Sequence, residues 1–120
     1  MNYNIVIAVA SGAAIGGVLR YVISALMNVQ SGKFPLSTLI INLVGSFLLG
    51  VFAAYAIKQN SSPAFKAFLT AGICGGFTTF STFSMETLLL LQNNQWALCF
   101  VYVMVSVMGG VLLAYLGMKI

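Results

Sequence analysis

Apolar residues fill four long stretches of this chain, and short polar breaks separate them. The stretches cover about residues 3–27, 35–57, 64–92 and 96–118. Each is long enough to cross a bilayer as a helix, which takes about 20 residues. The breaks contain asparagine, glycine and proline, which are typical of helix ends and turns. Segments of about 10 residues with alternating polarity, which would predict a membrane barrel, are absent.

Composition supports the same interpretation. The 120 residues are 61% hydrophobic and only 5% charged, whereas a soluble domain carries roughly 25% charged residues and needs them to cover its surface. We therefore predict an all-α integral membrane protein with one four-helix transmembrane domain spanning residues 1–120. An even number of spans places both termini on the same side of the membrane.

The five basic residues are spread almost evenly along the chain. On the face that holds the N-terminus we expect Lys58, Lys66 and Lys119. Lys33 falls on the other face, with Arg20 near that end of the first span. This is a weak bias under the positive-inside rule, so charge leaves open either insertion in both orientations as an antiparallel pair or a single topology. The net charge of +4 is too dispersed to predict a nucleic-acid surface. Four helices are too few to enclose a pore, so we expect an oligomer, most commonly two-fold.

The third stretch is too long for a minimal span, and it contains glycines near its middle. Gly72, Gly75 and Gly76 each weaken a helix by about 1 kcal/mol relative to alanine. Thr78 and Thr79 follow and are also weak helix formers. We predict that this helix is broken near the bilayer midplane; the alternative is a continuous helix that kinks at the glycines. Carbonyl oxygens freed at such a break could ligate a hard cation, and the next helix would present its positive dipole end.

Beyond the predicted break, hydroxyl and aromatic residues alternate. Thr79, Thr82 and Glu86 lie on one helical face, with Phe80 and Phe83 one turn apart beside them. Hydroxyl groups donate hydrogen bonds to anions, and the edges of phenyl rings carry positive quadrupole density. Polar groups at this depth are costly and usually line a pathway. The pattern therefore predicts a weakly hydrated path for an anion, although a phenylalanine pair taken singly more often faces lipid or the core.

Two other intramembrane polar residues allow two interpretations each. Asn42 shares a helical face with Thr38 and Ser46, at four-residue spacing. Its amide needs a partner in hydrocarbon, so it either bonds a second helix or donates to a desolvated anion. Arg20 either snorkels or pairs structurally, or it raises the local potential for anions.

The chain has none of the usual catalytic groupings. It contains no histidine, no pair of carboxylates and no phosphate-binding loop, and its two cysteines, Cys74 and Cys99, lack a metal-binding spacing. We therefore do not expect an enzyme. One alternative to an anion channel is a small proton-coupled multidrug exporter of dual topology, but such carriers need a carboxylate in the first span, and the only carboxylate is Glu86. Another is an assembly subunit that transports nothing.

Three motifs resemble those of the small bacterial fluoride channels, the Fluc or CrcB family. They are Gly16-Gly17-Val18-Leu19-Arg20-Tyr21, Asn42-Leu43-Val44-Gly45-Ser46-Phe47 and Gly75-Gly76-Phe77-Thr78-Thr79-Phe80-Ser81-Thr82-Phe83. Length, four spans and balanced charge also fit, so the resemblance covers the whole chain. It implies an antiparallel homodimer of dual topology in the bacterial inner membrane. Such a dimer exports fluoride passively and protects the cell from fluoride toxicity.

The resemblance also implies roles for single residues. Phe80 and Phe83 form an aromatic box whose ring edges meet fluoride, and Asn42 donates to the anion. The carbonyls of Gly75 and Thr78, from both subunits, hold a structural sodium ion at the dimer centre. With the residue pattern, the resemblance assigns the fluoride pathway to Arg20, Thr38, Asn42, Thr79, Phe80, Ser81, Thr82, Phe83, Glu86, Tyr102 and Ser106. Correspondence is weaker in the fourth span, because Gly110 stands where a further hydroxyl is expected.

Overall fold

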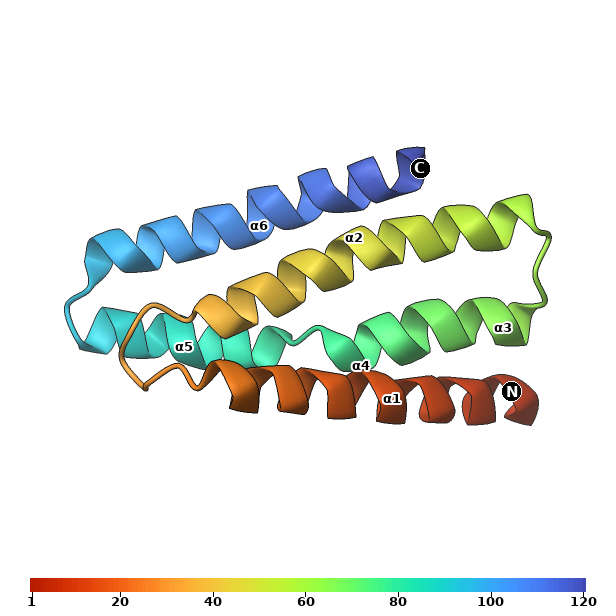
Figure 1. The fold of residues 1–120 in the computed structure, drawn as a ribbon, viewed down its shortest axis with the longest axis horizontal. Coiled ribbons are helices and arrows are strands. Elements are labelled where there is room, and N and C mark those ends of the chain that lie inside the picture. Colours follow the sequence, from red (N-terminus) through yellow and green to blue (C-terminus); the bar gives the residue numbers. More distant parts are fainter.

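The computed structural model describes residues 1–120 and is entirely helical, as predicted. In chain order the elements are α1 (Tyr3–Met27), α2 (Leu36–Lys58), α3 (Pro63–Ala67), the π-helical η1 (Phe68–Cys74), α4 (Gly75–Phe77), α5 (Phe80–Gln92) and α6 (Trp96–Lys119). The helical segments begin and end within one residue of the four apolar stretches. Of these helices, α1, α2 and α6 are each long and apolar enough to cross a membrane. Figure 1 shows an elongated bundle with both termini at the same end.

Local chemistry explains where several helices begin and end. The side chain of Ser62 caps α3 by accepting a hydrogen bond from the Phe65 amide at 3.2 Å. After α1, α2 and α5 the chain passes through Asn28, Asn60 and Asn94, whose φ angles are 48°, 50° and 57°. Asparagine is one of the few residues that adopts this left-handed conformation readily. Each turn thereby reverses the chain in a few residues.

The third apolar stretch does not form one uninterrupted α-helix. Segments α3, η1 and α4 follow one another directly, and regular helical structure then stops after Phe77. Thr78 (φ −81°, ψ 158°) and Thr79 (φ −147°, ψ 119°) are extended, and α5 begins at Phe80. The glycines expected to weaken the helix are themselves helical: Gly75, for example, has φ −64° and ψ −37°. The interruption therefore falls on two threonines.

These glycines instead allow α1 to lie directly against η1 and α4. A Cβ atom added at Gly16 would overlap the carbonyl oxygen of Ile73 and come within 2.8 Å of the Phe77 amide nitrogen. On the opposing segment, a Cβ atom at Gly76 would come within 2.9 Å of the Ala13 Cα. Close backbone approach through small residues is the usual way in which helices associate in lipid. Gly72 and Gly76 are therefore used for close packing against α1.

A second close contact joins α2 to α6. A Cβ atom at Gly50 would overlap the Ala114 carbonyl oxygen, and one at Gly117 would overlap that of Phe47. The bundle thus consists of two tightly packed pairs, α1 with η1 and α4, and α2 with α6, whereas α1 and α2 touch little. Only 18 of 120 residues are buried, and most large apolar side chains face outward. Such a surface suits lipid and would be unstable in water.

Candidate functional site

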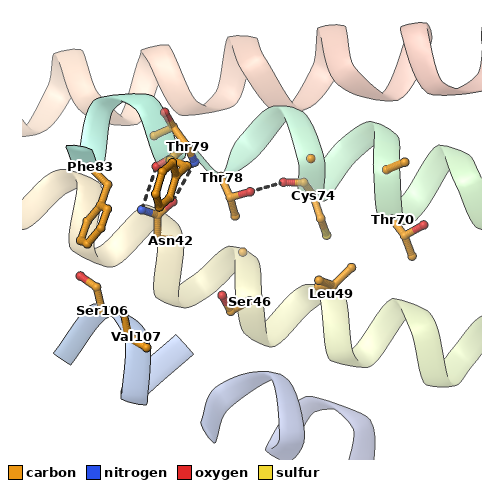
Figure 2. Close-up of a pocket in the computed structure, with 14 residues that line it drawn as sticks. Asn42, Ser46, Leu49, Thr70, Cys74, Thr78, Thr79, Phe83, Ser106 and Val107 are labelled. Atoms are coloured by element: carbon orange, nitrogen blue, oxygen red, sulfur yellow. Dashed lines mark hydrogen bonds between the residues drawn. The ribbon is translucent and has the colours of Figure 1, made fainter. Parts of the chain in front are cut away.

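A hollow of about 490 Å³ lies beside the interruption, between α2, the η1–α5 segment and α6. We call it the central hollow; Figure 2 shows its lining. Its polar lining residues are Asn42, Ser46, Thr70, Thr78, Thr79 and Ser106, and its aromatic lining residues are Phe80 and Phe83. These residues come from three separate parts of the sequence, so the hollow exists only in the folded chain.

Asn42 pairs with the backbone of the interruption through two hydrogen bonds. The Thr79 amide donates to Asn42 Oδ1 at 2.9 Å, and Asn42 Nδ2 donates to the Thr79 carbonyl at 3.2 Å (Figure 2). The Asn42 side chain therefore supplies hydrogen-bond partners to the amide and carbonyl of Thr79, which lies outside the helices. Buried backbone groups need such partners. An amide nitrogen carries two hydrogens, and this bond uses one of them. The second is left for another acceptor in the hollow, so both interpretations of Asn42 from the sequence are compatible with its position.

The interruption also shows a contrast between engaged and free carbonyl groups. The Cys74 carbonyl accepts from both the amide and the hydroxyl of Thr78, at 3.0 and 2.9 Å. The Gly76 carbonyl accepts from Arg20 Nε at 3.1 Å. The carbonyl oxygens of Gly75 and Thr78 accept no hydrogen bond from the residues outside the regular helices. Two acceptors are therefore left over beside the central hollow, which both residues line.

Four aromatic rings lie close together beyond the interruption. The ring centroids of Phe80 and Phe83 are 5.8 Å apart, and those of Phe83 and Tyr102 are 5.1 Å apart. Phe34 meets Tyr102 edge-on at 5.8 Å. Phe80 is 78% exposed although it stands in the middle of the chain's polar motif. Tyr102 is fully buried, and its hydroxyl donates to Glu86 Oε1 at 3.0 Å.

A second hollow, of about 320 Å³, opens at the end of the bundle away from the termini. We call it the end hollow. Thr38, Thr82 and Glu86 line it, together with Lys33 from the loop between α1 and α2. Through its hydrogen bond to Glu86 and its ring contact with Phe83, Tyr102 links the end hollow to the central hollow.

The structure thus divides the predicted pathway residues between two hollows. Asn42, Thr79, Phe80, Phe83 and Ser106 line the central one, as do Gly75 and Thr78. Thr38, Thr82 and Glu86 line the end hollow, and Tyr102 lies between the two. Ser81 lines neither, but its Oγ lies 3.4 Å from Thr79 Oγ1.

Arg20 also lines neither hollow; it instead holds the Gly76 carbonyl, which is the structural pairing considered above. The hollows also contain Ser46 and Lys33, which were not assigned to the pathway from the sequence. The four-residue spacing from Asn42 could have indicated Ser46. The position next to the end of a span could have indicated Lys33.

Comparisons with known proteins give a consistent picture. A family model described as "CrcB-like protein, Camphor Resistance (CrcB)" matches residues 7–118. The chain is 47% identical over 118 residues to a protein of Shewanella pealeana, covering 98% of this chain and 95% of the relative. It is 44% identical to a protein of Flavobacterium psychrophilum, covering 93% and 92%. Both relatives carry the name fluoride-specific ion channel FluC.

Proposed function

The chain belongs to the CrcB family, and we propose that it is a fluoride-selective channel through which fluoride leaves the cell passively. A multi-pass membrane protein of this kind is a channel and not an enzyme. The observation that carries the proposal is the central hollow. There, an amide from α2 and the phenylalanines of α5 converge on a non-helical backbone in an otherwise apolar bundle.

The chemistry of the hollow suits a small, strongly hydrated anion. Fluoride gives up tightly held water on entry, so donors must replace that water at close range. The free hydrogen of Asn42 and the hydroxyl groups of the hollow that do not donate to the backbone supply such donors. The ring edges of Phe80 and Phe83 add positive quadrupole density and exclude bulk water.

The path we propose runs through both hollows. An anion enters the end hollow past Lys33, follows Thr38 and Thr82, and reaches the central hollow beside Phe83. Glu86, the only carboxylate, is held by the Tyr102 hydroxyl on this route. The partial positive charge of the tyrosine hydroxyl hydrogen partly offsets the negative charge of the carboxylate and so lessens its repulsion of the passing anion.

We further propose that the functional unit is an antiparallel homodimer in the bacterial inner membrane. One chain leaves Phe80 78% exposed and cannot enclose the hollow on its own. A second copy would cover that side. Since the lysines are spread between both ends of the bundle, insertion in both orientations is compatible with the positive-inside rule.

A structural sodium ion at the dimer centre is part of the proposal. The carbonyl oxygens of Gly75 and Thr78 suit such an ion, because no amide of the non-helical backbone donates a hydrogen bond to them. Hard cations are held by oxygen ligands and take several of them, so two carbonyls from each of two copies are a suitable set. When bound, the ion would supply positive charge that holds the two interruptions together.

The proton-coupled exporter is not favoured. α1 contains no carboxylate that could exchange protons for a cationic drug, and its polar end group, Arg20, is bonded to the Gly76 carbonyl. The relatives, moreover, are named as fluoride channels.

The test is ion efflux from liposomes that contain the purified protein, followed with a fluoride electrode and a chloride electrode in parallel. Rapid fluoride efflux without chloride efflux is the expected result. Equal efflux of the two anions would contradict selectivity, and no efflux of either would contradict a channel.

A further inference from the structure

Two hydroxyl groups in the central hollow make no hydrogen bond within the chain. Helical serine and threonine commonly donate to the carbonyl four residues earlier. Thr70 and Thr78, which line the same hollow, do so at 2.8 and 2.9 Å. Ser46 and Ser106 make no such bond, and Ser106 Oγ is buried without any partner. An unused donor in a bilayer is costly, so these two hydroxyls call for an acceptor that comes from outside the chain.

The position of Ser46 brings its hydroxyl to the seam between α2 and α6. Ser46 lies one helical turn after Asn42, on the same face of α2. A Cβ atom at Gly110, one turn after Ser106 on α6, would lie 3.4 Å from Ser46 Oγ. Figure 2 shows Ser46 and Ser106 on the side of the hollow formed by α2 and α6. The missing side chain at Gly110 therefore leaves space directly in front of the Ser46 hydroxyl.

We propose that the Ser46 hydroxyl contacts the conducted anion, and that Gly110 provides the space in which this contact is made. Ser46 then continues the line of donors from Asn42 along the α2–α6 seam toward the end of the bundle that holds the termini, while Ser106 lines the hollow from α6. The inference rests on the proposed fluoride channel and assigns the donor that serves this part of its path.

The experiment measures fluoride efflux from liposomes for matched variants. Ser46→Ala is expected to slow efflux roughly tenfold, the factor that corresponds to a loss of about 1.4 kcal/mol. Ser11→Ala removes a hydroxyl of α1 that donates to the Ile7 carbonyl and lines neither hollow, and it should keep efflux within about twofold of the parent. Gel filtration checks that each variant keeps the oligomeric state of the parent.

A second substitution separates anion contact from packing. In the Ser46→Ala background, Gly110→Ser places a hydroxyl in the same space and should restore most of the lost efflux. Gly110→Ala, which fills the space without a donor, should not. Rescue that depends on a hydroxyl is not expected if Ser46 only packs between helices.

The outcomes also separate this inference from the function on which it rests. If the parent protein conducts no fluoride, the proposed function fails and this inference with it. If the parent conducts and Ser46→Ala conducts equally well, this inference alone is overturned. A slow Ser46→Ala variant that Gly110→Ser does not restore would overturn it as well.

Discussion

The close contact between α1 and η1 predicts opposite outcomes for two adjacent glycines. Gly16 is buried, and an added Cβ atom would overlap the Ile73 carbonyl oxygen and crowd the Phe77 amide at 2.8 Å. At Gly17 an added Cβ atom would meet nothing within 4 Å. Backbone atoms cannot rotate out of the way as side chains can, so Gly16→Ala forces α1 and η1 apart. Gly17→Ala requires no movement.

The comparison between these variants isolates the cost of the overlap. A Gly→Ala change in a helix stabilises it by about 1 kcal/mol, and this gain is common to both positions. Overpacking a close contact costs about 1–3 kcal/mol. Gly16→Ala should therefore be less stable than Gly17→Ala by about 1–3 kcal/mol, while Gly17→Ala should equal or exceed the parent.

The assay is unfolding by titration with sodium dodecyl sulfate in mixed micelles, followed by circular dichroism, with fluoride efflux measured in parallel. Because Ile73 and Phe77 lead into the interruption, displacing them moves the Gly75–Thr78 segment, and efflux of Gly16→Ala should fall severalfold. Equal stability and equal efflux in the two variants would refute the backbone contact between α1 and η1.

Three further predictions concern the site itself. Asn42→Ala removes both hydrogen bonds to Thr79. At about 0.6 kcal/mol for each intramembrane bond, the variant should lose about 1.2 kcal/mol of unfolding free energy in the same titration, and its fluoride efflux should fall by more than tenfold. Unchanged efflux would contradict the role of this amide. Phe80→Ile and Phe83→Ile should each severely reduce efflux while gel filtration shows an unchanged dimer; normal efflux in both would remove the aromatic rings from the path. Exhaustive removal of sodium should weaken the dimer and lower efflux if the Thr78 carbonyl is a ligand; unchanged behaviour in sodium-free buffer would rule against the ion.

The positions of the helices could be predicted from the sequence, because the length of each apolar stretch decides where the chain can cross a membrane. The place of the interruption was harder. Helix propensity pointed to the glycines and threonines of residues 72–79 together, but of the glycines Gly72 and Gly76 lie against α1, and all three are helical. The extended residues are Thr78 and Thr79, whose backbone is held by Asn42. Tertiary packing here outweighs local propensity.

The candidate site could be assembled from the sequence only in part. The resemblance of the motifs to those of a known family predicted that Asn42, Phe80 and Phe83 belong to one site. Composition and spacing could not reveal that Arg20 holds the Gly76 carbonyl, since these residues lie 56 positions apart. Nor could they show which hydroxyls donate to the backbone and which remain free, because that depends on the direction of each side chain.

The packing order of the helices has a consequence for how the protein is made. α1 packs against η1 and α4 rather than against α2, and Asn42 finds its partner 37 residues later in the chain. At about 5–20 residues per second, the second span is synthesised roughly 2–7 s before Thr79 emerges from the ribosome. During that interval the Asn42 amide has no native partner, and the first two helices contact each other little. The bundle therefore closes late, when the third stretch arrives, and until then the polar amide must find a partner outside the native fold.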